Sequence, residues 1–423
     1  MNTTVLCVDI GTTSLKAALI GKRSHILGYS RQEIPHDFDA AQNWIHALAR
    51  AVATFSKPKI HAVCISGNGP TIVSESGKTL IWNAPAEQPI MAAPSYEKSL
   101  FIPRLLAFKQ KFPAAWKNDR YIFSGPEYLL WQLTDNPLTI LPETRYTDYY
   151  WTDSMLAEAG FTAEEMNKLP HFTSPACFAG KITKEAAQIT GIKAGTRVFC
   201  GAPDFIAALV GTNTLRSGDM YDRAGSSEGI NLCTAVPVYG KNIRTLPSII
   251  PKLWNASMLI PESGSRFAAF REKVQFQTKR TYSNQALTDE IIANGGGHLP
   301  IPLAVEGRDL IVKLAQEVKA AVATLTYAAF RTHVVTPEGK AEEAVPLPDM
   351  MTLSGGQATN EAWSRYKCSI ADITGKVPVC TDAELMGDNI FARVGMGEYK
   401  SIEQAADALV KIETHYYPAT TEL

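Results

Sequence analysis

Apolar and polar positions follow two different periods along the first third of the chain. Runs rich in apolar residues over 4–10 and 15–21 predict two strands joined by the turn at Gly11, a third strand is expected over 25–32, and the run over 60–67 is typical of a buried strand. Between the third and fourth strands, residues 40–55 carry apolar side chains at helical spacing. Residues 70–82 have the pattern of a hairpin that turns at Ser76 and Gly77. Three strands, a helix and a further strand predict a mixed α/β layer.

Helical spacing dominates much of the remaining chain. The pattern is helical from Pro103 to about Leu133, and again over residues 183–195, where Gly191 and Gly195 end it. Further elements are expected as a long helix over 309–330, a strand over 350–356 that ends in glycines, and helices over 360–375 and 401–413. Residues 255–298 carry no readable pattern.

A second stretch repeats the order of elements found at the N-terminus. Residues 5–20 give a strand, a small-residue turn at Gly11 and a return strand, and residues 218–236 give the same order around a turn at Gly225 to Ser227. Two such strand–turn–strand segments predict a duplicated architecture, with two domains and a cleft between them. We expect the domains to cover residues 1–217 and 218–423.

Composition agrees with two globular domains and excludes several partners. The chain has 423 residues, of which 45% are hydrophobic and 20% charged. Its formal net charge of −1 does not indicate binding to nucleic acid or to an anionic membrane surface. The seven scattered cysteines form no Cys-x-x-Cys pair and are expected to be reduced thiols of a cytoplasmic protein. Neither a signal-peptide pattern nor a span of roughly 18 apolar residues is found.

The first candidate for chemistry is the turn between the first two strands. It follows Asp9 and contains Gly11, Thr12 and Thr13. Outward N–H groups of a tight turn bind phosphate oxygens, and small hydroxyl residues let the anion come close. A carboxylate beside such a turn can hold Mg²⁺ through water. On this interpretation Asp9 serves the metal and the turn serves the phosphates; an ordinary hairpin with an Asx-type turn is the alternative.

Other short motifs fail on their spacing. The segment "SGKTL" lacks the glycine of a phosphate loop five residues before Gly77, because Ile72 stands there. The segment "GNGPTI" has the same isoleucine where a dinucleotide-binding motif needs its third glycine. The eight histidines include no His-Glu-x-x-His and no close pair, so a zinc site has no support.

Four segments in order resemble the signature segments of one family. They are "DIGTTSLK", "GAPDFIAALVG", "AGSSEGINL" and "LSGGQATNEAWSRYKCSIADITGKVPV", and they look like those of the FGGY-type carbohydrate kinases, the group of xylulose and glycerol kinases. The resemblance covers most of the chain, with residues 255–298 as the main gap. It implies two ribonuclease-H-like domains of the actin and hexokinase type, which close on Mg²⁺, ATP and a sugar. The first domain would lie on the sugar side and the second on the nucleotide side.

The resemblance also assigns roles to single residues. It makes Asp204 the general base, and the chemistry agrees, because a sugar hydroxyl needs a carboxylate to take its proton during attack on the γ-phosphate. The plain alternative is that Asp204 caps the following helix. Both roles are compatible, since a helix N-terminus keeps a carboxylate ionised.

Two glycine motifs are expected to bind ATP. Gly225, Ser226 and Ser227 match the family's Gly-Thr-Ser phosphate turn, with serine in place of threonine. Gly355 and Gly356 match the glycines that let adenosine lie against the second domain. A plain strand-to-helix turn is the alternative for the second motif.

The expected sugar pocket departs from the family. The chain has "SGNGPTIV", with Asn68, where xylulose kinases carry Gln-Met-His-Gly, so their histidine is missing. Trp82 is kept without the aspartate and arginine that usually follow, and Glu143 stands where an aspartate is usual. We expect these three residues to face the substrate. Asp388 and Asn389 occupy positions where small alanines are usual.

These features support an ATP-dependent kinase of a ketose, polyol or sugar acid. A catalytically impaired sensor of the same fold, binding nucleotide or sugar, is the alternative; retention of both Asp9 and Asp204 counts against it. An ATPase of the actin and chaperone type is less favoured, since no peptide-binding module is expected. The sequence leaves open which sugar and which hydroxyl react, and whether the protein is a monomer or a homodimer.

Overall fold

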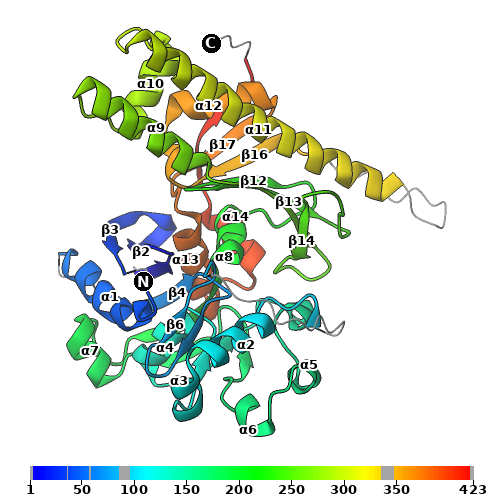
Figure 1. Ribbon diagram of the computed structural model, residues 1–423. Coiled ribbons are helices and arrows are strands. Elements are labelled where there is room, and N and C mark those ends of the chain that lie inside the picture. Colours follow the sequence, from blue (N-terminus) through cyan, green and yellow to red (C-terminus); the bar gives the residue numbers. More distant parts are fainter. Residues whose placement is uncertain (1–2, 36, 57–58, 85–95, 335–346, 420–423) are drawn as a thin grey trace. The chain divides into compact units, whose positions relative to one another are not determined.

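The computed structural model describes residues 3–419 except 36, 57–58, 85–95 and 335–346 (Figure 1). Packing divides the chain into two compact units, residues 1–211 with 384–409, and residues 212–383 with 410–423. Residues 384–409, which the sequence assigned to the second domain, therefore pack with the first unit. The division into a sugar-side domain, 1–217, and a nucleotide-side domain, 218–423, stays a prediction.

The first unit is built on a six-stranded sheet of order β10-β11-β4-β1-β2-β3. Its strands are β1 (Val5–Ile10), β2 (Ser14–Ile20), β3 (Ile26–Glu33), β4 (Ala62–Gly67), β10 (Phe178–Lys181) and β11 (Arg197–Pro203). Strands β1, β2 and β3 are antiparallel neighbours, whereas β1, β4 and β11 run parallel. Both β1 and β4 are buried along their whole length, as their continuous apolar runs predict. The expected mixed α/β layer is confirmed.

Helices pack against both faces of this sheet (Figure 1). One group is α1 (Trp44–Ala53), α4 (Glu127–Thr134) and α7 (Lys184–Thr190), and another is α8 (Asp204–Gly211), α13 (Ala383–Gly395) and α14 (Ile402–Leu409). Glycine is required where α13 meets α8, because a Cβ at Gly387 would lie 2.1 Å from the carbonyl oxygen of Ala207.

Short elements fill the segment between β4 and β10. They are β5 (Ile72–Ser74), β6 (Thr79–Leu80), β7 (Ile122–Phe123), β8 (Thr139–Ile140), β9 (Phe172–Thr173), α2 (Ile102–Lys111), α3 (Pro113–Asn118), α5 (Asp153–Glu158), α6 (Ala163–Met166) and the 3₁₀ turn η4 (Thr144–Tyr149); η1 (Lys22–Ser24) and η2 (Ala40–Asn43) lie earlier. The hairpin expected at Ser76 and Gly77 is confirmed, since β5 pairs antiparallel with β6. The helical stretch expected over 103–133 is broken into α2, α3, β7 and α4, because Pro113 lacks an N–H group and begins a new helix.

The second unit is built on a seven-stranded sheet of order β14-β15-β13-β12-β16-β17-β18. Its strands are β12 (Met220–Ala224), β13 (Glu228–Thr234), β14 (Arg244–Pro247), β15 (Trp254–Ile260), β16 (Met350–Ser354), β17 (Thr374–Pro378) and β18 (Ile412–Tyr416). The expected closing helix over 401–413 was too long, because α14 ends at Leu409 and β18 follows.

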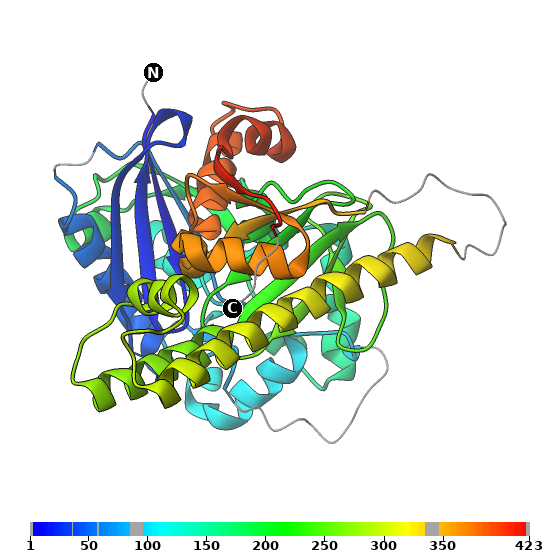
Figure 2. The same ribbon diagram turned by 90° about the horizontal axis from the view of Figure 1, so that it is seen from above.

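The helices of the second unit are α9 (Ser263–Thr278), α10 (Asn284–Asn294), α11 (Ile301–Val334) and α12 (Glu361–Ala371), with the 3₁₀ turn η5 (Gly356–Thr359). Figure 2 shows α11 running along the sheet beside α12, and it contacts β13 and β15. The unreadable residues 255–298 contain most of β15 and all of α9 and α10. Although α11 has 34 residues, no helix in the described part of the chain is apolar enough over its length to cross a membrane.

The two sheets repeat one topology. The order β10-β11-β4-β1-β2-β3 of the first unit corresponds to β18-β17-β16-β12-β13-β15 of the second. Each successive pair also has the same direction: antiparallel, parallel, parallel, antiparallel and antiparallel. The duplicated architecture expected from the sequence is confirmed, and β14 is an addition to the second copy.

Candidate active site

Three parallel strands of the first unit end at the same edge of its sheet. The turn at Gly11 follows β1, Asn68 follows β4, and Asp204 follows β11. The backbone N–H of Asn68 donates to the carbonyl oxygen of Ile10 at 2.9 Å, which joins two of these strand ends. Loops at the carboxyl edge of parallel strands commonly form ligand sites. The fold therefore gathers residues that lie far apart in the sequence.

Asn68 links the candidate base to the candidate phosphate turn. In the amide orientation that pairs donors with acceptors, its Nδ2 donates to Asp204 Oδ2 at 3.0 Å. Its Oδ1 then accepts from the backbone N–H of Thr12 at 2.8 Å and from the Thr12 hydroxyl at 3.0 Å. The other carboxylate oxygen of Asp204, Oδ1, accepts from the backbone N–H of Phe205 at 2.7 Å. Asp204 is the first residue of α8, where the helix dipole favours an ionised carboxylate.

Trp82 also reaches the first turn. Its indole Nε1 donates to the hydroxyl oxygen of Thr12 at 2.9 Å, and its side chain is 44% exposed. Trp82 and Asn68 therefore meet at Thr12, which leaves much of the indole surface open to a ligand. Thr13, the next residue of the turn, is exposed.

Glu143 does not join this group. Its carboxylate accepts from Arg145 Nε at 2.8 Å and from the Thr144 hydroxyl at 2.9 Å, both within its own turn. Burial alone would raise its pKa, but these hydrogen bonds hold the pKa of Glu143 below its usual value. Among the described residues, none of its hydrogen bonds reaches Thr12 or Asn68. The expectation that Glu143 faces the substrate stays a prediction.

Asp9 lies beside a second carboxyl group that the sequence did not connect with it. Asp9 is 4% exposed and is the register partner of Ser66 on β4. Asp388, on α13, accepts from the Ser66 hydroxyl at 3.0 Å and from Cys64 Sγ at 3.6 Å. Burial, and next the charge of Asp9, raise the pKa of Asp388 well above its usual range, which favours a neutral acid. The departure from alanine at position 388 was the only signal in the sequence.

The residues around Asp9 fit Mg²⁺ as a weakly coordinated ion. Asp9 offers carboxylate oxygens, and Mg²⁺ commonly takes one or two carboxylates, with water and phosphate oxygens as its other ligands. No group of three His, Cys, Asp or Glu side chains in the described residues could hold a metal by itself. A metal at this edge would therefore depend on phosphate as well as on Asp9.

In the second unit, two glycine motifs meet at one sheet edge. Strands β12 and β16 are parallel, and the first is followed by residues 225–227 and the second by Gly355 and Gly356. Gly355 has a φ of +83°, and a Cβ there would lie 2.3 Å from the carbonyl oxygen of Ala224. Only glycine allows this approach. The structure thus brings the two candidate ATP motifs together.

The N-terminus of α9 braces the turn at residues 225–227. The backbone N–H of Ser265 donates to the carbonyl oxygen of Ser226 at 3.1 Å, and the backbone N–H of Glu262 donates to the hydroxyl of Ser227 at 3.0 Å. Two backbone N–H groups of one segment therefore hold the turn at the exposed Ser226 and its neighbour Ser227. Sequence reasoning missed this support because it lies within residues 255–298.

A buried ionic cluster lies between the strands that flank the same turn. Lys367 Nζ, on α12, donates to Asp222 of β12 and, at 2.9 Å, to Glu228 Oε1 of β13. All three side chains are at most 1% exposed. Burial, and next the charge of Glu228, raise the pKa of Asp222. Burial opposes the charge of Lys367, but the two carboxylates hold its pKa above the usual value. No pattern in the sequence revealed this cluster.

Comparisons with known proteins agree with the sequence resemblance. No protein-family model matches the chain. It is 22% identical to an autoinducer-2 kinase of Yersinia enterocolitica, over 98% of this chain and 90% of that protein. Among solved structures, a ligand-bound xylulose kinase from Lactobacillus acidophilus has a TM-score of 0.73 at 16% identity, and a gluconate kinase from the same organism has 0.74 at 16%. Each covers 99% of this chain and 94% of the other.

These likenesses extend over both units, beyond the four signature segments. At 16% identity, the structural neighbours show a shared fold and nothing more. The curated relative adds a likeness in sequence over nearly the whole chain. Together with the four segments in order, they support an FGGY-type carbohydrate kinase.

Proposed function

We propose that the protein transfers the γ-phosphoryl group of ATP to a hydroxyl of a small carbohydrate, with Asp204 as general base. The relatives and structural neighbours are named as autoinducer-2, xylulose and gluconate kinases. The observation that carries the proposal is the link from Asp204 through Asn68 to Thr12, because it joins a carboxylate to a turn suited to phosphate.

Each residue at the edge of the first sheet then has a role. Asp204 Oδ2 takes the proton of the attacking hydroxyl, which contributes about 10²- to 10⁴-fold to such reactions. Asn68 orients this carboxylate, and Trp82 presents its exposed indole face to the acceptor. The backbone of the turn at Gly11 approaches the phosphate oxygens.

The second unit supplies the nucleotide contacts in this proposal. Residues 225–227 hold phosphate oxygens, and Gly355 and Gly356 leave room for the adenosine. Asp9 would hold Mg²⁺, which when bound neutralises charge on the phosphate oxygens.

A catalytically impaired sensor of the same fold is not favoured. A sensor needs to hold nucleotide or sugar but has no chemical use for a base. Asp204 is nevertheless kept at a helix N-terminus with one carboxylate oxygen bonded to each of two partners, Asn68 and Phe205. This arrangement supports transfer.

The variant Asp204→Asn tests the proposed base. The amide has the shape of the carboxylate but cannot take a proton, so phosphoryl transfer from ATP should fall by about 10²- to 10⁴-fold while ATP affinity stays within about twofold. Asp135→Asn is the matched control, because Asp135 is exposed in the same unit and asparagine accepts its φ of +58°. Wild-type turnover in Asp204→Asn would contradict the assignment.

A further inference from the structure

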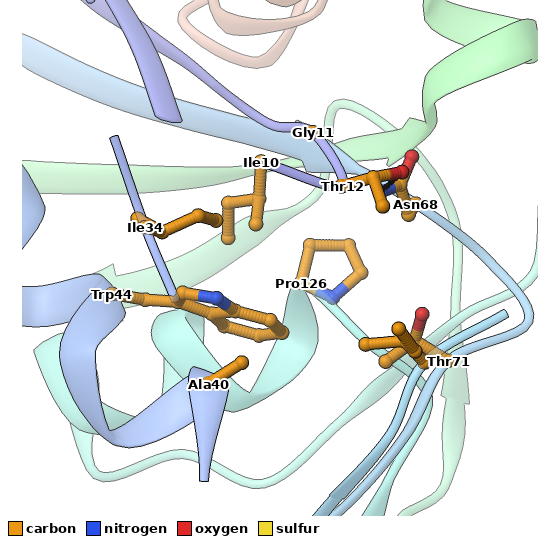
Figure 3. Close-up of a pocket in the computed structure, with 10 residues that line it drawn as sticks. Ile10, Gly11, Thr12, Ile34, Ala40, Trp44, Asn68, Thr71 and Pro126 are labelled. Carbon is orange, nitrogen blue, oxygen red and sulfur yellow. Dashed lines mark hydrogen bonds between the residues drawn. The ribbon is translucent and has the colours of Figure 1, made fainter. Parts of the chain in front are cut away.

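An amide side chain holds each of the two candidate phosphate turns. Asn68 lies beside Thr12 of the first turn (Figure 3) and accepts from its backbone N–H at 2.8 Å. In the second unit, Gln357 of η5 donates from Nε2 to the carbonyl oxygen of Gly225 at 3.0 Å. A Cβ at Gly264, in the first turn of α9, would lie 2.1 Å from this oxygen and 3.2 Å from the Nε2 atom. Gln357 therefore meets the second turn where α9 also reaches it.

Because peptide bonds are planar and trans, a carbonyl group held in one direction aims the N–H of the next residue in the opposite direction. The Gly225 carbonyl accepts from Gln357. The Ser226 carbonyl accepts from the backbone N–H of Ser265, in α9, at 3.1 Å. The N–H groups of Ser226 and Ser227 therefore point away from η5 and α9, respectively. Successive N–H groups that a turn directs outward form an anion-binding nest.

Trp363 fixes the amide of Gln357. Its indole Nε1 donates to Gln357 Oε1 at 3.0 Å. An indole N–H can only donate and a backbone carbonyl oxygen can only accept, so the two partners allow one orientation of the amide. Trp363 is 6% exposed, and its backbone N–H donates to Oδ1 of Asn360, the N-cap of α12, at 3.0 Å. The side chain that holds the phosphate turn is therefore itself fixed by a buried ring.

We propose, on the basis of the nucleotide contacts in the proposed function, that Gln357 is a positioning residue for the phosphates of ATP. Through the Gly225 carbonyl it aims the Ser226 N–H at a phosphate oxygen. The η5 turn has support of its own, because the Gly355 N–H donates to the carbonyl oxygen of Thr381 at 2.8 Å. Loss of the amide should therefore affect the phosphate turn and spare the adenosine turn.

The variant Gln357→Met tests this role, because methionine has a similar length and makes neither hydrogen bond. The Kd for ATP, measured by calorimetry, should rise about tenfold. The Kd for adenosine, measured by competition with ATP, should stay within about twofold of wild type, which a general loss of structure would not allow. Gln285→Met is the control and should change neither value, because Gln285 is exposed on α10 of the same unit.

The variant Trp363→Phe tests how the amide is held. It removes the N–H that fixes Gln357, so the Kd for ATP should rise about threefold. Combined with Gln357→Met, it should not weaken ATP binding beyond the effect of Gln357→Met alone, because the amide on which it acts is already gone. Effects that multiply in the double variant would contradict the link through Trp363.

The same measurements separate this inference from the kinase function. An unchanged Kd for ATP in Gln357→Met, or an equal rise for adenosine, would overturn the inference while the kinase function stands. If the wild type binds ATP but transfers phosphate to no acceptor, the kinase function is contradicted, and a tenfold rise in Gln357→Met would still support the inference. A wild type that binds no ATP would overturn both.

Discussion

Asn68 stands where the xylulose kinases carry a different segment, yet its amide joins Asp204 to Thr12. It spans the distance between Asp204 Oδ2 and the backbone of Thr12 with hydrogen bonds of 3.0 and 2.8 Å. A hydrogen bond to a charged group contributes about 1.5–3 kcal/mol. The Asn68 amide and the backbone N–H of Phe205 therefore both orient the proposed base.

Asn68→Ala should lower kcat by about 10- to 100-fold, because the Asp204 carboxylate loses a donor that fixes its direction. Steady-state kinetics with the preferred acceptor measure this loss. Asn167→Ala, at an exposed position of the same unit, should leave kcat unchanged. If Asn68→Ala changed only the KM for the acceptor, Asn68 would bind substrate without orienting the base.

Buried Lys367 is expected to contribute to the stability of the protein. Lys367→Met leaves Asp222 and Glu228 buried together without their cation, and breaking a buried pair in this way costs about 3–5 kcal/mol. The loss in the free energy of unfolding should be larger at pH 8 than at pH 6. Burial raises the pKa of Asp222, and its protonation at the lower pH relieves the repulsion between the two carboxylates. Urea denaturation at both pH values measures it. Adding Glu228→Gln should recover part of the loss; no recovery would argue against repulsion as the cause.

The η5 turn closely approaches the end of β12, and this approach depends on Gly355 but not on the adjacent Gly356. Gly355 has φ +83° and no space for a Cβ beside Ala224, whereas a Cβ at Gly356 would meet no atom within 4 Å. Substitution at Gly355 therefore tests the need for a positive φ and a close backbone contact, and substitution at Gly356 tests the loss of a glycine without them.

Gly355→Ala should lower the free energy of unfolding by at least about 1–3 kcal/mol, the usual cost of a side chain in a backbone region reserved for glycine. It should also weaken ATP binding, because Gly355 packs against the end of β12, and the turn at residues 225–227 follows β12. Gly356→Ala is the control and should stay near the wild-type stability. Denaturation and nucleotide titration of both variants measure the difference, and equal effects would contradict the steric explanation.

The first turn of α4 gives a prediction on pH. Glu127 is buried and accepts from the backbone N–H of Ile140 at 2.9 Å, and burial raises its pKa to about 7 from an ordinary 4.5. The folded protein therefore keeps a proton that the unfolded chain releases. The free energy of unfolding should fall as pH rises from about 4.5 to about 7, by about 3 kcal/mol in total.

Glu127→Gln tests this slope. Glutamine keeps an oxygen for the Ile140 N–H group but has no charge to lose, so the variant should be less sensitive to pH over this interval and more stable than wild type at pH 8. Urea denaturation at pH 5 and pH 8 compares the two proteins. Parallel pH dependence in wild type and variant would show that other groups cause the slope.

For the whole molecule, local patterns predicted the duplicated sheets well. The strand, turn and strand around Gly11 and again around Gly225 are continuous in sequence, and the two sheets share one strand order. The return of residues 384–409 to the first unit was not predictable, because it depends on packing such as that of Gly387 against Ala207. Helices α9 and α10 were missed for another reason: few of their side chains are buried, so their apolar spacing is weak.

The candidate site was predictable partly from local pattern and partly from the family resemblance. Asp9 was singled out from the turn that follows a recognisable strand, whereas Asp204 and Asn68 were singled out by their positions in family segments. Asp388 beside Asp9 could not be predicted, because their proximity depends on contacts between segments far apart in sequence. Glu143 was chosen from a family position, and its hydrogen bonds remain within its own turn.

The most direct measurement is ADP release from MgATP by the purified protein, with and without each member of a panel of ketoses, polyols and sugar acids. We predict release that depends on the acceptor and far exceeds the rate without any acceptor. ATP binding with no acceptor-dependent release across the panel would contradict a carbohydrate kinase and favour the sensor.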